Sequence, residues 1–490
     1  MGIFSKLQDK IKSAIPRSVI RDLSEILKPD QIVLDQAGLQ AFETDALTAI
    51  QVLPFVVVMP ESTEDVAAIA KISHKYDVPM VPRGAGTSLA GGAIPLSNAI
   101  VVCLSRMNRI LEIDLMNRSA KVQAGVTNLA ISAAVDRDGF FYAPDPSSQL
   151  SCTIAGNVAM NSGGAHCLKY GVTTHNILGV KLVTAEGQIL EFGGSFLDPA
   201  GYDFLSLIVG SEGGLGIVTE ATVLLRAKPE GARPLLLGFE THEQAGDCVA
   251  AIIGKGYLPV AIEFMDKPAI KACEEHAHAG YPLDVEALLI IEFEGSNDEI
   301  DASFQQILRI ASEFNPVHKR IASTEEEAAA IWLGRKSAFG AIGRISEYLC
   351  MDGVIPLSKL SHVLSKITEI CDTYKFKVSN IFHAGDGNLH PLILYDANRT
   401  GEFQRVEKCG AEILELCVLA GGCITGEHGV GLEKRDLMTL QFDETDLVNQ
   451  MRVKLLFDPN WVLNPDKVFP LELAETFRRD ESSSSDGVSA

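Results

Sequence analysis

An Asp-Gly pair at residues 386–387 stands between two apolar runs, at residues 378–382 and 391–395. Asp-Gly between such runs is the strongest short-range signal for a β-hairpin with a two-residue turn. In that register His383 faces His390 on the same side of the sheet, with Cβ atoms roughly 5 Å apart. This spacing suits two imidazoles that bind one divalent metal ion. A plain hairpin with two incidental histidines is the alternative.

The composition indicates a large protein of two or three domains. The chain has 490 residues, of which 47% are hydrophobic. Its net charge of −22 disfavours nucleic acid as a partner, because phosphates favour a basic surface. The ten cysteines form no Cys-x-x-Cys pair, which argues against an iron–sulfur cluster and favours reduced thiols. No apolar run approaches the roughly 20 residues that span a bilayer, so we expect a cytoplasmic protein, either free or peripheral at the membrane surface.

Strand-like and helical patterns alternate along the chain and predict an α+β fold in five parts. Glycine clusters concentrate in residues 50–228. Two β–α units in residues 229–420 predict helices packed on an antiparallel sheet. Residues 471–490 are polar and rich in serine, so we expect them to be disordered. The parts are an N-terminal helical segment (1–49), a glycine-rich region (50–228), the β–α region (229–420), a C-terminal segment (421–470) and a tail (471–490).

Three glycine-rich clusters lie at residues 82–92, 144–164 and 210–217. Small residues allow backbone N–H groups to approach the phosphates of a ligand, and Arg83 could add positive charge. The first cluster matches neither the dinucleotide-binding fingerprint nor a Walker A loop. Each cluster alone is as consistent with a turn that binds nothing. Three of them within about 140 residues suggest one extended ligand in a long groove.

Polar residues in the second half of the chain could complete a metal site next to the hairpin. Glu427 and His428 are adjacent in a glycine-flanked loop. Glu427 could join the two histidines in a site with two imidazoles and one carboxylate, and His428 could act as a base. Arg335, on a helical stretch, could bind a carboxylate with two hydrogen bonds. A solvated Glu-His pair and an exposed helix arginine are the alternatives.

Taken in order, these motifs resemble the FAD-linked oxidases of the vanillyl-alcohol oxidase/PCMH superfamily, in the D-2-hydroxyacid dehydrogenase branch. Within the branch they are most similar to the D subunits of bacterial glycolate oxidases (glycolate dehydrogenases). The resemblance covers about residues 17–470. The stretches that carry it are PRGAGTSLAGGA, PDPSS with TIAGNVAMNSGG, KYGVT, VGSEGGLGIVTE, AIEFMD, RKSAFGAIGRI, HAGDGNLHP and GEHGVGLEK.

The resemblance implies a two-part PCMH-type FAD-binding domain at 50–228, an antiparallel-sheet substrate or cap domain at 229–420, and a helical C-terminal region whose residues 421–470 return to the flavin. It also implies FAD contacts, and non-covalent binding, because no residue is clearly placed for a covalent link. Asn464 belongs to Asn-Pro-Asp-Lys, where the family has Asn-Pro-Gly-Lys. The FAD-binding residues that we expect are Arg83, Gly84, Ala85, Gly86, Thr87, Ser88, Pro144, Ser147, Thr153, Gly156, Asn157, Gly163, Ile217 and Asn464.

The resemblance assigns metal ligands and catalytic residues as well. His383, His390 and Glu427 match the ligands of a divalent metal, which is zinc in characterised relatives and manganese or iron elsewhere. His428 matches the catalytic base, and Asn388 matches an amide of the substrate site. Arg335 matches the arginine that holds the substrate carboxylate.

Two departures from the family favour a small substrate. Where hydroxyglutarate enzymes of this branch carry a threonine and a lysine, this chain has Phe339 and Cys350. Neither side chain can hold a second carboxylate. Glycolate or D-lactate is therefore favoured over a dicarboxylate.

The resemblance thus implies oxidation of a 2-hydroxy acid to the 2-oxo acid. The metal lowers the pKa of the hydroxyl, His428 takes its proton, and the hydride passes to flavin N5. The electrons go to a non-nicotinamide acceptor, either partner subunits with a second flavin domain and an iron–sulfur protein or a quinone; a homo-oligomer is a further option. The alternatives are a D-lactate-specific or D-2-hydroxyglutarate dehydrogenase, a silent flavin-binding subunit, and a nicotinamide-dependent dehydrogenase, which the missing fingerprint disfavours.

Overall fold

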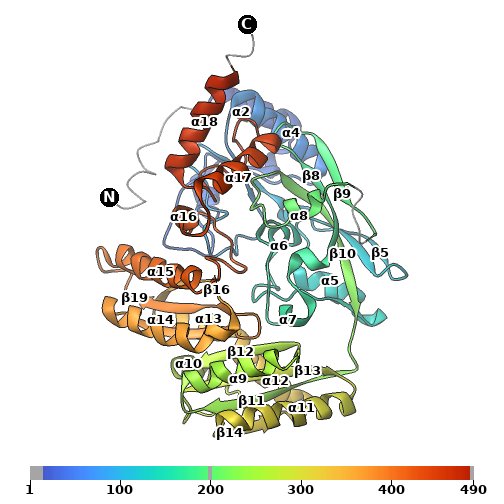
Figure 1. The fold of residues 1–490 in the computed structure, drawn as a ribbon. Helices are drawn as coiled ribbons and strands as arrows, with labels where there is room; N and C mark the ends of the chain where they lie inside the picture. Colours follow the sequence, from blue (N-terminus) through green and yellow to red (C-terminus); the bar gives the residue numbers. More distant parts are fainter. Residues whose placement is uncertain (1–14, 197–200, 486–490) are drawn as a thin grey trace.

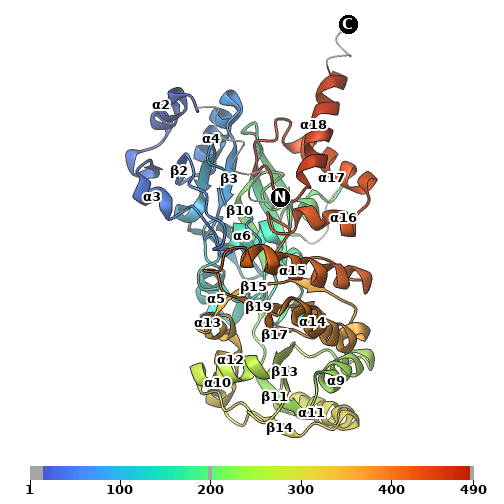
Figure 2. The same cartoon turned by 90° about the vertical axis from the view of Figure 1, so that its left-hand side faces the viewer.

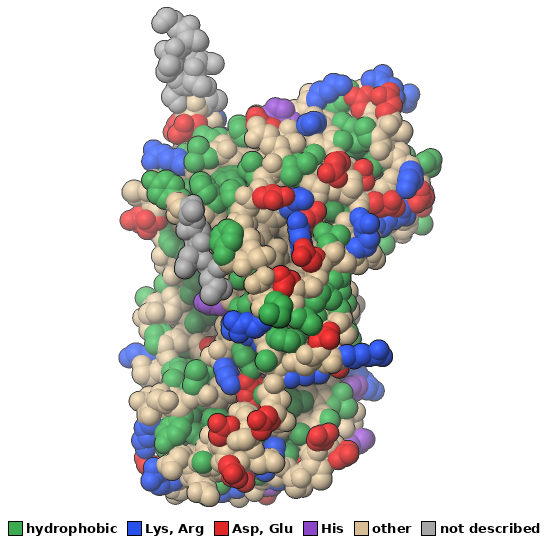
Figure 3. Space-filling view, turned by 90° about the vertical axis from the view of Figure 1, so that its right-hand side faces the viewer, with side chains coloured by type: hydrophobic (Ala, Val, Ile, Leu, Met, Phe, Trp, Pro, Cys, Tyr) green, Lys and Arg blue, Asp and Glu red, His purple; other side chains and the backbone are tan. Residues whose placement is uncertain are grey.

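The structure, a computed structural model, describes residues 15–196 and 201–485. Its helices and strands form the α+β fold expected from the sequence, with three sheets in the part that is described. Figure 1 shows the first two sheets at one end of the molecule and the third sheet at the other. On the face shown in Figure 3, acidic, basic and hydrophobic side chains are interspersed.

The first sheet has three parallel strands and one antiparallel strand at its edge. Its inner strands are apolar throughout, because one face packs into the large core of this half and the other face into a smaller cluster. The helix α4 (Thr63–Tyr76) begins with a capping box formed by Ser62 and Asp65, and it packs against the second sheet. The strands, in spatial order, are β1 (Ile32–Val33), β2 (Val56–Val58), β4 (Ile100–Cys103) and β3 (Met80–Arg83).

The N-terminal segment, expected to be helical, contains α2 (Arg17–Ile26) and α3 (Gln36–Gln40). It also provides β1, which pairs with β2. The first 14 residues lie outside the described residues. This segment is therefore part of the first sheet and its helical layer.

The second sheet is antiparallel and shares its core with the first. Its long strand β10 (Ile217–Ala227) pairs with β6, β7 and β8. The other strands are β5 (Ile110–Asp114), β6 (Ser119–Gln123), β7 (Phe140–Tyr142), β8 (Ile177–Val183) and β9 (Ile189–Gly193). The helices of this region are α5 (Asn128–Val135), α6 (Ile154–Met160), α7 (Cys167–Tyr170) and α8 (Phe204–Ile208).

The third sheet is antiparallel and has helices on both faces, as Figure 2 shows. Its strands are β14 (His318–Ile321), β11 (Gly231–Phe239), β13 (Ala287–Gly295), β12 (Ala261–Asp266), β17 (Lys377–His383), β18 (Asn388–Leu389), β16 (Gly353–Val354), β19 (Pro391–Tyr395) and β15 (Glu347–Cys350). One face is covered by α9 (His242–Gly254), α11 (Asn297–Ala311), α14 (Leu360–Tyr374) and α15 (Glu402–Leu419). The other is covered by α10 (Lys267–Ala277), α12 (Glu325–Lys336) and α13 (Ala338–Gly343).

The hairpin predicted from the Asp-Gly pair is present between β17 and β18, but the predicted register is wrong. His383 pairs with Asn388, so the connection has four residues, 384–387, instead of two. The difference of two positions keeps every side chain on its predicted face, because side chains alternate with a period of two. The rings of His383 and His390 therefore still meet, with centroids 5.2 Å apart.

Contacts with distant strands explain the longer connection. The N–H of Gly385 donates to the carbonyl of Ile262, and the N–H of Ile355 donates to the carbonyl of Gly387. Asp386 accepts a hydrogen bond from the N–H of Asn388 through its side chain. These bonds hold the loop open and satisfy backbone groups that a two-residue turn would pair locally.

After the third sheet the chain returns to the first two through α16 (Met438–Gln441) and α17 (Glu444–Phe457). Met80 in β3 donates to the carbonyl of Val462 and accepts from the N–H of Asn464. The prediction of a disordered tail is wrong for residues 471–485, which form α18 (Leu471–Ser485). Ala474 and Phe477 are buried in a cluster with Trp461 and Phe469, so a short apolar stripe fixes a helix of polar composition.

A partly buried charge cluster joins the second-sheet region to the third sheet. The ring of His166 binds the carboxylates of Asp145 and Glu292 at 2.7 and 3.0 Å. The indole N–H of Trp332 donates to the second oxygen of Glu292 at 2.6 Å. Burial alone would lower the pKa of His166, but the two carboxylates outweigh it and raise this pKa to about 10. His166 is therefore a cation between two carboxylates.

Replacing His166 with alanine is expected to destabilise the protein by about 3 kcal/mol, because two partly buried carboxylates lose their shared cation. Lys169→Ala is the matched control, since Lys169 pairs with Glu294 at the surface and should cost about 1 kcal/mol or less. Thermal unfolding at a fixed scan rate measures both. The raised pKa stabilises fully below pH 6.5, and this stabilisation is lost as pH rises through about 10. Equal shifts for the two variants would contradict this account.

Candidate active site

A cavity of about 480 Å³ is lined by residues from the N-terminal segment, the glycine-rich region, the third-sheet region and the segment at 421–470. From the C-terminal half it receives Lys336, Phe339, Tyr348, Glu427 and His428. All but two of the residues expected to bind FAD line it. These residues are Arg83, Gly84, Ala85, Gly86, Thr87, Ser88, Ser147, Thr153, Gly156, Asn157, Ile217 and Asn464.

The two exceptions are Pro144 and Gly163. Pro144 precedes Asp145, whose carboxylate binds His166. A side chain at Gly163 would place its Cβ 2.6 Å from an oxygen of Glu427. Gly163 therefore makes room for the carboxylate of Glu427 and does not line the cavity.

The predicted metal ligands come together at the cavity. The Oε1 atom of Glu427 lies 3.4 Å from Nε2 of His383 and 3.2 Å from Nε2 of His390. The ligand atoms of the three residues all lie within 4.8 Å of one another. Burial opposes ionisation of Glu427, but hydrogen bonds from the two histidines outweigh it and hold its pKa well below the usual value.

These residues fit a divalent cation. His390 is buried: its Nε2 atom faces the carboxylate oxygens of Glu427 and Asp352 at 3.2 and 3.5 Å, and its Nδ1 atom makes no hydrogen bond. Buried polar atoms without a partner are rare and are explained where an ion binds. Two imidazoles and one carboxylate are the donors of catalytic zinc and of non-haem iron sites, and open positions remain for a substrate.

His428 lies beside this cluster and also lines the cavity. Its ring stacks on that of His390, with centroids 4.9 Å apart and an angle of 11° between the planes. Burial lowers the pKa of His428 to about 4. The imidazole is therefore neutral near pH 7 and can accept a proton.

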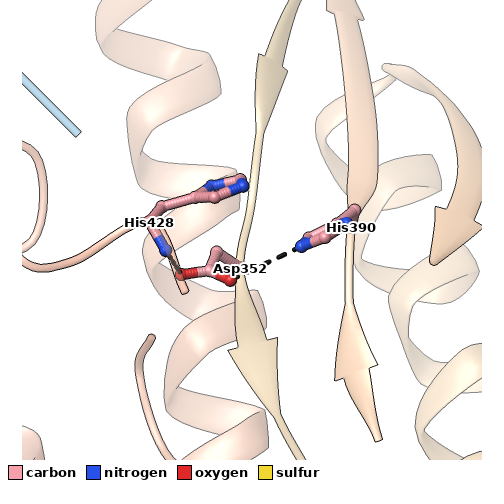
Figure 4. Close-up of side chains that lie close together, drawn as sticks. All are labelled: Asp352, His390 and His428. Atoms are coloured by element: carbon pink, nitrogen blue, oxygen red, sulfur yellow. Dashed lines mark hydrogen bonds and ion pairs between the residues drawn. The ribbon is translucent and has the colours of Figure 1, made fainter. Parts of the chain in front are cut away.

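Asp352, two residues after β15, was not predicted as part of the site. Figure 4 shows its carboxylate between His428 and His390. One oxygen of this carboxylate lies 3.5 Å from Nε2 of His390. Asp352 forms a second group with these two histidines whose atoms could hold a metal ion. The only signal in the sequence was a lone acidic residue in a strand-like apolar run.

Glu263 in β12 was also missed, and it connects two residues that were predicted. Its Oε1 atom accepts from Nδ1 of His383 at 2.7 Å, which leaves Nε2 of His383 facing Glu427. Its Oε2 atom binds Arg335 through Nε at 2.8 Å and Nη2 at 2.6 Å. A carboxylate behind a ligating histidine fixes the tautomer of the ring and its orientation.

Arg335 is buried in this ion pair and is not among the residues that line the cavity. Asn388 is buried opposite His383, and a Cβ at Gly426 would lie 2.4 Å from its Nδ2 atom. The Oδ1 atom of Asn388 makes no hydrogen bond. The structure thus brings Asn388 close to the loop of Glu427 and His428. Arg335 is connected to His383 only indirectly, because both bind Glu263.

Aromatic residues form the wall of the cavity next to the histidines. The ring of Phe339 is 6.2 Å from that of His390 and 6.2 Å from that of Tyr348. Cys350 is buried in the core behind this wall. Lys336, which the sequence did not single out, adds an amino group at the cavity.

The models of two protein families match most of this chain. Residues 54–193 match the FAD binding domain, and residues 228–468 match the C-terminal domain of FAD linked oxidases. The glycolate oxidase subunit GlcD of Escherichia coli (strain K12) is 45% identical over 468 residues, which are 94% of this chain and 94% of that protein. This chain belongs to the FAD-linked oxidase family.

Other members of the FAD-linked oxidase family are similar along most of their length. The GlcD subunit of Bacillus subtilis (strain 168) is 38% identical over 93% of this chain and 97% of that protein. A D-lactate dehydrogenase of Anaerostipes hadrus is 32% identical over 85% of this chain and 89% of that protein. The structure of p-cresol methylhydroxylase covers 94% of this chain and 98% of its own, with a TM-score of 0.79 at 15% identity. The PCMH-type fold expected from the sequence is therefore confirmed.

The loop after β3 fits the phosphates of FAD, the cofactor of this family. Among the described residues, the backbone N–H groups of 85–88 have no hydrogen-bond acceptor, so they are available to bind anionic oxygens. Gly84 permits the close approach, because a Cβ there would lie 2.2 Å from Oγ1 of Thr153. Gly86 has a φ of 73°, a backbone conformation that favours glycine.

Asn464 holds the glycine-rich loops of the FAD-linked oxidase together. Its Nδ2 atom donates to the carbonyls of Gly92 and Glu212, and its Oδ1 atom accepts from Lys467. Asp466 stands where the family has glycine and has a φ of 63°. Aspartate tolerates this left-handed conformation better than most residues. The motif therefore keeps its backbone conformation although aspartate replaces glycine. No described helix is both long and apolar enough to cross a membrane.

Proposed function

We propose that this FAD-linked oxidase oxidises a small 2-hydroxy acid, glycolate or D-lactate, to the 2-oxo acid with the help of a divalent cation. The observation that carries the proposal is the cluster of His383, His390 and Glu427, with the ring of His428 stacked on that of His390 and with Glu427 and His428 on the wall of the cavity. The names of the relatives, glycolate oxidase subunit and D-lactate dehydrogenase, support this substrate class. Zinc is the cation that we propose first.

The residues of the chain would bind the substrate and move its proton. His428 accepts the proton of the hydroxyl, because its ring is neutral and faces the cavity. Glu427 stays ionised, and Glu263 holds His383 in the tautomer that leaves Nε2 free. A cation bound to these residues would lower the pKa of the hydroxyl, and bound FAD would accept the hydride from the substrate carbon.

We propose that cationic side chains beside the cluster bind the substrate carboxylate. Glu263 binds Arg335 through Nε and lies 2.6 Å from Nη2, so the remaining N–H groups of the guanidinium are available for a substrate. Lys336 is the alternative, because it lines the cavity. We also propose that Asn388 donates to the substrate, and that Phe339 and Tyr348 restrict the cavity to a small side chain.

We propose that FAD is bound without a covalent link and that its electrons pass to a non-nicotinamide acceptor. Because two relatives carry the word subunit in their names, partner proteins with a second flavin domain and an iron–sulfur centre are the acceptors that we favour over a quinone. All ten cysteines are free thiols, which supports a reducing cytoplasmic location. A homo-oligomer is compatible with the proposal.

Anaerobic mixing of the purified protein with four acids tests the substrate class. We expect glycolate, D-lactate or both to bleach the flavin, and L-lactate and D-2-hydroxyglutarate to act at least ten times more slowly. Bleaching by D-2-hydroxyglutarate alone would contradict the role of Phe339. Bleaching by none of the acids would indicate a silent flavin-binding subunit.

A further inference from the structure

Asp352 lies directly behind the loop that carries Glu427 and His428. Its side chain is fully buried. Its Oδ2 atom accepts from the N–H of Gly426 at 3.0 Å and from the N–H of His428 at 2.9 Å. Its Oδ1 atom accepts from the N–H of Glu427 at 3.2 Å. Three consecutive backbone N–H groups therefore converge on one carboxylate.

Side chains strengthen this arrangement at both ends of the loop. The hydroxyl of Thr425 donates to Oδ2 of Asp352 at 2.5 Å. The amino group of Lys434 lies 3.4 Å from the same oxygen and donates to the carbonyl of Gly429 at 3.1 Å. Lys434 is fully buried, so it balances the charge of Asp352 where water cannot.

The loop depends on these contacts because its own sequence is flexible. Gly426, Gly429 and Gly431 allow the backbone many conformations, and Gly429 has a φ of 82°. Consecutive N–H groups that point at one place form a concave site that requires an anion. Without that anion, we expect the loop to change its backbone conformation and to move both functional side chains.

We propose that Asp352 is a positioning residue that sets the place of Glu427 relative to His428, so that the metal ligand and the base face the same substrate. This inference rests on the proposed function. Asp352 acts through the backbone of the loop, because both of its oxygens accept hydrogen bonds from the loop's N–H groups. Its distance of 3.5 Å to Nε2 of His390 adds a contact on the other side of the cluster, as Figure 4 shows.

Asp352→Asn tests the inference, because asparagine keeps the shape but replaces one acceptor oxygen with an amide that cannot accept. The protein is loaded with FAD, treated with a chelator and titrated with Zn²⁺ against a chromophoric competitor. We expect the affinity for Zn²⁺ to fall 10- to 100-fold. We expect kcat for flavin reduction to fall at least tenfold, with a smaller change in KM and with FAD retained.

Asp266→Asn is the matched control. Asp266 is also buried and accepts backbone N–H groups, from Ala269 at 3.0 Å and from Asn380 at 2.5 Å, but it lies away from the loop. We expect its replacement to lower the unfolding temperature without changing Zn²⁺ affinity or flavin reduction per folded molecule. A purely structural role for Asp352 would give both variants the same profile.

A second variant is available if Asp352→Asn does not fold. Thr425→Val removes one donor to Asp352 and leaves every proposed ligand in place. We expect it to weaken Zn²⁺ binding several-fold. Wild-type Zn²⁺ affinity and kcat in Asp352→Asn, or in Thr425→Val if only that variant folds, would overturn the role of Asp352. If the wild-type protein itself neither bound Zn²⁺ nor was bleached by any acid, the proposed function would fail instead.

Discussion

Replacement of His428 by alanine is expected to slow the reduction of the bound flavin by substrate by about 10²- to 10⁴-fold, the usual contribution of a general base. The ring is neutral because burial lowers its pKa to about 4, and it lines the cavity beside His390. FAD should remain bound, since the loops at residues 84–88 and 153–157 are unchanged. Anaerobic stopped-flow absorbance measures the rate.

His362→Ala is the control for this variant, because His362 lies exposed on α14. We expect it to reduce its flavin at the wild-type rate. Flavin content should be equal in the wild-type protein and in both variants. A wild-type rate in His428→Ala with FAD bound would contradict the assignment of the base.

Loss of the metal ion is expected to have an effect of similar size. His390→Ala should lose bound Zn²⁺ and slow flavin reduction at least about 100-fold, because nothing then stabilises the negative charge that develops on the hydroxyl oxygen. The variant keeps the FAD loops, so the effect separates the metal site from the cofactor. Metal analysis and stopped-flow absorbance of the same sample measure the two losses together.

Treatment of the wild-type protein with a chelator should reproduce the effect of His390→Ala. Added Zn²⁺ should restore the rate in the wild-type protein but not in the variant, which lacks the imidazole that would bind it. Reduction at an undiminished rate in metal-free protein that retains FAD would show that the cluster of His383, His390 and Glu427 does not assist the reaction.

Local patterns in the sequence predicted much of the fold. The glycine-rich loop after β3 was predicted because its small residues follow an apolar strand and allow backbone N–H groups to approach a ligand. The hairpin was predicted because an Asp-Gly pair stands between two apolar runs, and its side chains lie on the expected face. Its register was not predictable from the Asp-Gly pair, because Ile262 in β12 and Ile355, which follows β16, fix the loop through their backbones.

The residues that the sequence did not reveal act through partners far along the chain. Glu263 binds Arg335 and His383, which lie 72 and 120 residues away. Asp352 binds the loop at Gly426, 74 residues away. A lone acidic residue in an apolar strand signals only that a partner must exist. The helix α18 was missed because its buried Ala474 and Phe477 are few among polar neighbours.

The most direct test of the central claim is to count the product formed per flavin. The FAD- and Zn²⁺-loaded protein is mixed anaerobically with glycolate, and in a parallel sample with D-lactate, and the 2-oxo acid is quantified alongside the loss of flavin absorbance. The account predicts one molecule of 2-oxo acid for each flavin reduced, with at least one of the two acids. Oxidised flavin and no 2-oxo acid in the presence of either substrate would contradict it.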